Sequence, residues 1–367
     1  MSPAAALSAR SSSSSRARVM IVDDSAVVRG LVSRWVNESG QFDVVGTAAN
    51  GRAAIDLADR TQPDIVLLDL DMPELDGISA LPRLLEKQPG LAVIVVSTLT
   101  QRNAAISLKC LSLGTLDYLP KPATNREVTT SLGFRQELVA KVEGLARPRR
   151  AAPSSETEPR RTAAAAPRPR VPVAPRCLLI GASTGGPRAI AEVLAGLNGA
   201  LRQVPTLVVQ HMPPIFTTVF AEHLQGQLGV PAREAQDGEA PVAGQIYVAP
   251  GGRHLGLVRD KLHKVVLRVD DAPAVNFCRP AVDILFRDAA AVFGASALAV
   301  VLTGMGSDGL AGAKALAAAG AAIIAQDEAT STVWGMPGHV ARGGLAEEIL
   351  PLEGIAASIR QRLGAGQ

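Results

Sequence analysis

The sequence has few of the residues that mark several common classes of protein. It contains three cysteines in 367 residues, Cys110, Cys177 and Cys278, and none of them forms a Cys-x-x-Cys pair. This spacing argues against a zinc site or a disulfide framework and suits a reducing cytosol. The net charge is only +3, from 37 basic and 34 acidic residues. We therefore expect no nucleic acid partner.

Long hydrophobic segments are also missing. No apolar run is long enough to span a bilayer, because the Ala-rich stretch at 310–325 is interrupted by Lys314 and by glycines. The N-terminus has five consecutive serines at 11–15 and lacks the apolar region of a signal peptide. These features predict a disordered tail at 1–17 and a cytoplasmic protein that is not embedded in a membrane.

The remaining sequence is apolar enough, at 47%, to form real cores, and its length favours two domains. Residues 147–176 are rich in Pro, Ala and Arg and have no periodic apolar residues. Such a composition buries too little surface to offset the entropy of ordering. We therefore expect a linker at 146–176 between a first domain at 18–145 and a second at 177–367.

In the first domain, apolar strand-like segments alternate five times with helical ones. The strand-like segments are 19–22, 44–46, 65–68, 92–96 and 117–119. This alternation predicts an α/β domain with a five-stranded parallel sheet and helices on both faces. In such sheets the site lies beyond the carboxyl ends of the strands.

Polar residues follow four of these segments. Asp23 and Asp24 follow the first, Asp69 the third, Ser97 the fourth and Lys121 the fifth. The three aspartates offer the hard oxygen ligands that Mg²⁺ prefers, and Asp69 would accept a phosphoryl group. Ser97 and Lys121 would then bind the phosphoryl oxygens. The alternative is that each strand-end aspartate only caps the next helix.

The order Asp-Asp, LLDLDMPELDG, VVST and Lys-Pro resembles the receiver domain of bacterial response regulators, which has a flavodoxin-like fold. The resemblance covers essentially 18–145. It implies that Asp69, rather than Asp71 or Asp76, is the phosphoacceptor. It also implies that Tyr118 is the aromatic switch residue and that Mg²⁺ is the cofactor of phosphorylation.

The second domain begins with an apolar strand-like segment and a glycine-rich turn. Residues 177–181 precede Ser183, which is the serine of a Gly-x-Ser-x-Gly pattern at 181–185. A helical segment at 188–197 follows, so the pattern has the strand–turn–helix context of a nucleophile elbow. The helix start would offer N–H groups to a developing oxyanion. Phosphate binding is a weaker alternative because G-x-G-x-x-G and G-K-[ST] are absent, and a structural turn is another.

Partners for this serine follow two more apolar segments. His211 ends the segment 206–210, and Asp308 follows the segment 297–302. The carboxylate would hold the imidazole in the tautomer that accepts the serine proton. The order Ser, His, Asp differs from that of the α/β-hydrolases. The competing histidines are His223, His254, His263 and His339.

The segments GASTGG, VVQHMPPIFT, YVAPGGRH, VLTGMGSDG and AQDEATSTVWGMP resemble the catalytic domain of the chemotaxis protein-glutamate methylesterases. The resemblance implies a second doubly wound α/β domain with a mainly parallel sheet. It also implies a Ser183, His211 and Asp308 triad, with Thr184 and Met305 lining the site and no cofactor in this domain. Trp334 stands where a phenylalanine is common.

Together the two resemblances imply an enzyme activated by phosphorylation. It would hydrolyse glutamate 5-O-methyl esters on methyl-accepting chemoreceptors, releasing methanol, and deamidate receptor glutamines. A histidine kinase of the chemotaxis system would be the phosphodonor. Two alternatives remain: the same chemistry in a non-chemotaxis signalling array, and a catalytically inactive adaptor that depends on phosphorylation.

Overall fold

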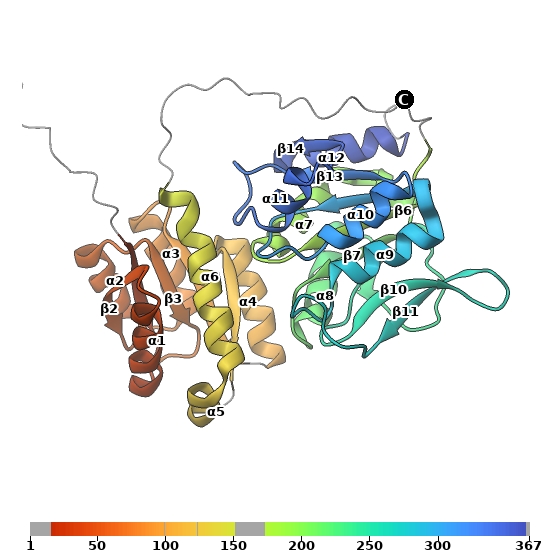
Figure 1. Ribbon diagram of the computed structural model, residues 1–367. Coiled ribbons are helices and arrows are strands. Elements are labelled where there is room, and N and C mark those ends of the chain that lie inside the picture. Colours follow the sequence, from red (N-terminus) through yellow and green to blue (C-terminus); the bar gives the residue numbers. More distant parts are fainter. Residues whose placement is uncertain (1–15, 99, 123, 151–172, 365–367) are drawn as a thin grey trace, which may run out of the picture. The chain divides into compact units, whose positions relative to one another are not determined.

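The computed structural model describes residues 16–98, 100–122, 124–150 and 173–364 (Figure 1). Most of the predicted tail at 1–17 and most of the predicted linker at 146–176 lie outside the described residues; Ala17, expected in the tail, is the first residue of a strand. The described chain contains two large sheets, one on each side of the linker in sequence. None of the described helices is both long enough and apolar enough to cross a bilayer.

The first sheet has five strands in the order β2-β1-β3-β4-β5, which confirms the predicted flavodoxin-like receiver sheet. The strands are β1 (Ala17–Val22), β2 (Phe42–Ala48), β3 (Ile65–Asp69), β4 (Ala92–Thr98) and β5 (Asp117–Lys121). All five residues of β3 are buried, as expected for a parallel strand covered on both faces. Asp69 is therefore the last residue of a buried strand.

The helices of this part begin where a side chain caps them. They are α1 (Ala26–Glu38), α2 (Gly51–Thr61), α3 (Gly77–Lys87), α4 (Gln101–Leu113), α5 (Asn125–Thr130) and α6 (Leu132–Arg150). The caps of the first five, whose side chains accept hydrogen bonds from first-turn N–H groups, are Ser25, Asn50, Asp76, Thr100 and Thr124.

The sequence predicts one helix at 125–144, but the structure has two. Ser131, at the end of α5, has an extended backbone, which breaks the helix there. The helix α6 then continues to Arg150, into the segment expected as a linker. Its buried face extends through Leu145 and Ala146, and this packing stabilises the additional turn.

The second sheet has seven strands in the order β14-β13-β12-β6-β7-β9-β8, and every pairing is parallel. The strands are β6 (Cys177–Ala182), β7 (Thr206–Gln210), β8 (Ala232–Glu234), β9 (Ile246–Val248), β12 (Ala297–Val301), β13 (Ala322–Gln326) and β14 (Glu348–Leu350). The predicted parallel α/β domain is thus confirmed. A separate antiparallel hairpin joins β10 (His254–Arg259) to β11 (Val265–Asp270).

Helices connect these strands and pack in pairs. They are α7 (Gly186–Leu197), α8 (Phe216–Leu228), α9 (Val282–Phe293), α10 (Leu310–Ala318), α11 (Met336–Arg342) and α12 (Leu352–Arg362). Figure 1 shows α9 and α10 side by side, and α7 packs against α12. The central strand β6 lies between β7 and β12, so the chain segments that follow these three strands meet at one edge of the sheet.

Candidate active site and phosphorylation site

The turn that carries Ser183 is held by backbone hydrogen bonds. Ser183 N donates to Thr303 O at 3.0 Å, and Ser183 O accepts from Gly186 N at 2.8 Å. A Cβ on Gly186 would lie 1.9 Å from Gln210 Oε1, and a Cβ on Gly304 would lie 2.9 Å from Ser183 N. Both glycines are therefore needed for the close packing of the three strand ends. The side chain of Ser183 is half-buried at the start of α7.

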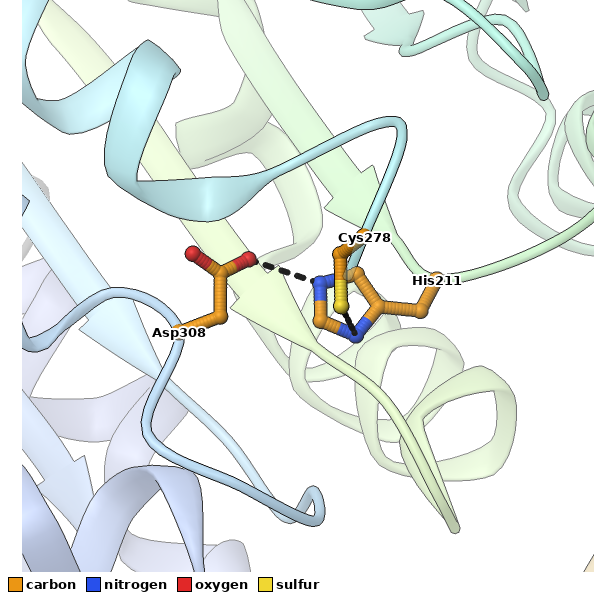
Figure 2. A group of neighbouring side chains, drawn as sticks. All are labelled: His211, Cys278 and Asp308. Atoms are coloured by element: carbon orange, nitrogen blue, oxygen red, sulfur yellow. Dashed lines mark hydrogen bonds and ion pairs between the residues drawn. The ribbon is translucent and has the colours of Figure 1, made fainter. Parts of the chain in front are cut away.

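His211 follows β7 and pairs with Asp308. Its backbone N–H donates to Ala182 O at 3.2 Å, which places His211 beside the end of β6. Its Nε2 lies 2.8 Å from Asp308 Oδ2 (Figure 2). Asp308 is only 2% exposed. The structure thus joins two of the three residues predicted as a triad.

The carboxylate of Asp308 also accepts hydrogen bonds from four other donors. They are the backbone N–H groups of Val282 (2.6 Å), Asp283 (3.1 Å) and Gly309 (3.0 Å), and Asn276 Nδ2 (3.2 Å). Burial by itself raises the pKa of this carboxyl group, but the hydrogen bonds from His211 and from the backbone lower it below its ordinary value. Asp308 is therefore a fixed anion.

The second nitrogen of the imidazole faces a thiol that the sequence analysis did not select. His211 Nδ1 lies 3.6 Å from Cys278 Sγ (Figure 2). In the described part of the chain, no hydrogen bond joins the hydroxyl of Ser183 to His211. Cys278 and Asn276 lie in a loop without periodicity or motif, so only their position shortly before α9 could have pointed to them.

The surroundings of His211 favour its protonated form. Burial by itself lowers the pKa of the imidazole, but the hydrogen bonds with Asp308 and Cys278 outweigh this and raise it to about 9. A general base must be unprotonated to act. Protonation of His211 therefore reduces general-base catalysis by this site at neutral pH.

We expect kcat/KM for ester hydrolysis to rise with pH through the pKa of His211. The Asp308→Asn variant should show this rise at lower pH, because the anion that stabilises the imidazolium is gone. Rates measured from about pH 6 to 10, corrected for spontaneous alkaline hydrolysis, check this. If the variant had the same pH profile as the wild type, the pairing with Asp308 would not be the cause of the raised pKa of His211.

The other candidate residues have different surroundings. His254 is fully buried, with its ring nitrogens bonded to Pro273 O (3.1 Å) and Ala281 N (3.2 Å). His339 Nδ1 lies 2.7 Å from Gly335 O, His223 is half-buried and His263 is exposed. Thr184 is buried next to the serine, and Met305 is half-buried in the loop that leads to Asp308. Of the five histidines, His211 alone pairs with a carboxylate among the described residues.

Three aspartates gather at the ends of β1 and β3. Oxygen atoms of Asp23, Asp24 and Asp69 lie within 4.8 Å of one another, with Asp24 exposed and the other two buried. Asp69 Oδ1 accepts a hydrogen bond from Leu70 N at 2.8 Å. Three hard oxygen donors at this spacing fit a magnesium ion.

The residues expected to bind a phosphoryl group lie on β4 and β5. Ser97 is 2% exposed, and its buried hydroxyl has no hydrogen-bond partner among the described residues. Tyr118 and Lys121 on β5 are also buried. The helices that follow β1 and β3 are capped by Ser25 and by Asp76, which accepts from Ser79 N at 2.8 Å, so the strand-end aspartates are not the caps of these helices.

Comparison with known proteins places the chain in a family. Residues 19–132 match the response regulator receiver domain family, and residues 178–359 match the CheB methylesterase family. A protein of Nitrobacter hamburgensis named protein-glutamate methylesterase/protein-glutamine glutaminase is 50% identical over 361 residues, covering 95% of this chain and 94% of its own. The chain belongs to the protein-glutamate methylesterase/protein-glutamine glutaminase family.

Other members and a solved structure are similar as well. A Rhodopseudomonas palustris methylesterase/glutaminase is 48% identical over 358 residues, which is 93% of each chain. The crystal structure of the Thermotoga maritima CheB methylesterase catalytic domain is 38% identical, with a TM-score of 0.49, over 52% of this chain and 99% of its own. The two methylesterase/glutaminases are similar to nearly the whole chain.

Proposed function

We propose that this chain hydrolyses glutamate 5-O-methyl esters on methyl-accepting chemoreceptors, releases methanol, and deamidates glutamines on the same receptors. The observation that carries the proposal is the 2.8 Å pair of His211 and Asp308 beside Ser183, in a chain that is 50% identical to a protein of this name. The proposed catalytic residues are these three, with Thr184 and Met305 lining the site.

The geometry supports a mechanism with a covalent acyl-enzyme. Asp308 holds Nε2 of His211, so Nδ1 is the nitrogen that would take the proton of the Ser183 hydroxyl. A thiol is a weak hydrogen-bonding partner, so the serine hydroxyl can displace Cys278 from this nitrogen. The serine oxygen then attacks the ester carbonyl, and backbone N–H groups at the start of α7 stabilise the oxyanion.

The same imidazole would complete both half-reactions. As the tetrahedral intermediate collapses, the imidazolium returns its proton to the leaving methoxide, and methanol departs. Water deprotonated by His211 then attacks the acyl-enzyme, which frees glutamate and restores Ser183. With a glutamine side chain the leaving group is ammonia, and the remaining steps are identical.

We further propose that residues 18–145 regulate residues 177–367 through phosphorylation of Asp69 by a histidine kinase in the cytoplasm. Asp23, Asp24 and Asp69 would hold Mg²⁺, which neutralises charge on the incoming phosphoryl group. The buried hydroxyl of Ser97, without a partner among the described residues, would donate to a phosphoryl oxygen, and Lys121 would pair with the group. Tyr118 would act as the aromatic switch.

Methanol release from membranes that contain methylated chemoreceptors tests this function directly. We expect release by the wild-type protein and faster release when a small-molecule phosphodonor is added. No release with or without the phosphodonor would favour an inactive adaptor. Release from the methylated receptors of a different signalling array, but not from chemoreceptors, would favour the other alternative.

Asp69→Asn should prevent phosphorylation of the receiver while basal hydrolysis remains measurable, because the amide oxygen is too weak a nucleophile to accept the phosphoryl group. Incorporation of labelled phosphate from a small-molecule donor measures this. The exposed neighbour Asp71 provides the matched control, since Asp71→Asn should be labelled like the wild type. Labelling of the Asp69 variant at the wild-type level would move the phosphoacceptor to another residue.

A further inference from the structure

A two-residue turn precedes α9 close to the catalytic pair. Val275 N donates to Cys278 O at 3.0 Å, and Cys278 N donates to Val275 O at 2.8 Å, which closes a narrow hairpin. The residues between them, Asn276 and Phe277, have φ angles of +52° and +63°. Two successive positive φ angles are typical of a type I′ turn, for which Asn-Gly is the preferred sequence.

Phe277 stands where such a turn normally has glycine. A bulky side chain is strained in the left-handed region, and it gains no local hydrogen bond there as asparagine does. Packing does not compensate for this strain, because Phe277 is 104% exposed. Residues held in strained backbone conformations cluster at functional sites, where the strain serves binding or catalysis.

The turn is attached to both members of the catalytic pair. Asn276 Nδ2 donates to Asp308 Oδ1 at 3.2 Å and to Asp283 Oδ2 at 2.9 Å. On the other side of Phe277, Cys278 Sγ lies 3.6 Å from His211 Nδ1. The phenyl ring therefore lies in solvent, and the residues on either side of it, Asn276 and Cys278, contact Asp308 and His211.

We propose that Phe277 is a substrate-positioning residue that packs against the apolar surface of the receptor helix next to the scissile ester. This proposal rests on the proposed function. A methylated glutamate side chain on a helix is flanked by residues three and four positions away, and an aromatic ring can bury the apolar ones among them. The ring would fix the receptor segment while the ester carbonyl meets Ser183.

The Phe277→Gly variant distinguishes a role in binding from a role in folding. It removes the ring, which should weaken binding, and also the backbone strain, which should not destabilise the fold. We expect the melting temperature to stay the same or rise, since glycine adopts the turn freely. We expect KM for methylated receptor to rise about tenfold with little change in kcat, as for a contact made equally in the ground and transition states. The ratio of kcat/KM for receptor to kcat/KM for a small soluble methyl ester should fall about tenfold.

Two further variants sharpen the comparison. Phe277→Tyr retains an aromatic ring and should keep the wild-type ratio of kcat/KM for the receptor to kcat/KM for the small ester. Leu262→Gly is the matched control, because Leu262 is an exposed apolar residue (73%) in the β10–β11 turn, next to His263 with φ +59°. This turn lies at the end of the hairpin opposite to His254, and the control should keep the wild-type ratio.

Each outcome of the experiment decides between the alternatives. A Phe277→Gly ratio within about twofold of wild type overturns the proposed contact, as does an equal loss on both substrates with a lowered melting temperature. In the second case Phe277 would be a structural residue. Wild-type protein that releases no methanol from methylated receptors overturns the proposed function itself, whatever the variant does.

Discussion

Ser183→Ala should reduce methanol release from methylated receptors by a factor of about 10⁴ to 10⁶, because it removes the nucleophile and leaves only binding and oxyanion stabilisation. The fold should be unaffected, since the hydrogen bonds of Ser183 with Thr303 and Gly186 are made by its backbone. Methanol release and thermal melting, measured on the same preparations, check both statements.

A matched control is available in the same domain. Ser307 is also half-buried and also lies in a loop after a buried strand, and Ser307→Ala should retain nearly the wild-type rate. If Ser183→Ala kept more than about a tenth of the wild-type turnover, the serine mechanism would be wrong.

His211→Gln should be about as damaging as the serine substitution, and Asp308→Asn about tenfold to a hundredfold less damaging, because members of a triad contribute unequally. The amide of Asp308→Asn can keep only part of the acceptor geometry that the carboxylate offers to its five donors. We therefore also expect this variant to lose about 1–3 kcal/mol in the free energy of unfolding.

The control for the histidine substitution is His263→Gln, because His263 is exposed at the β10–β11 turn. It should hydrolyse the ester at the wild-type rate. If His339→Gln had no activity while His211→Gln remained active, His339 rather than His211 would be the base.

Much of the fold could be predicted because its signals are local. Buried strands such as 177–181 and 297–302 are short apolar runs, and each is followed by a glycine-rich or polar turn. The alternation of strands with helices predicted the parallel sheet of the first domain, and the resemblance to the methylesterases implied the parallel sheet of the second. The prediction of one helix at 125–144 overlooked the break at Ser131: Thr130 and Gly133 beside it are weak helix formers, and the Ser131 hydroxyl accepts a hydrogen bond from Phe134 N as a helix cap does.

The candidate site was predictable only where a residue follows a strand. His211 and Asp308 follow β7 and β12, and the common carboxyl edge of a parallel sheet brings them together. Asn276 and Cys278 reach the same place from an irregular loop, whose path depends on distant contacts such as those of His254 with Pro273 and Ala281. No periodicity in the sequence encodes such a path.

The five hydrogen bonds accepted by Asp308 have a consequence for how the site exchanges protons with solvent. The two oxygens of a carboxylate have about four lone-pair sites, and five donors already point at them. Protonation of the carboxylate would displace at least one of these donors, so the imidazole takes up an added proton before the carboxylate does. Between the raised pKa of His211 and the lowered pKa of Asp308, the pair gains or loses one proton, on the imidazole. Activity should therefore respond to acid as a one-proton titration, with no second, cooperative step from the carboxylate.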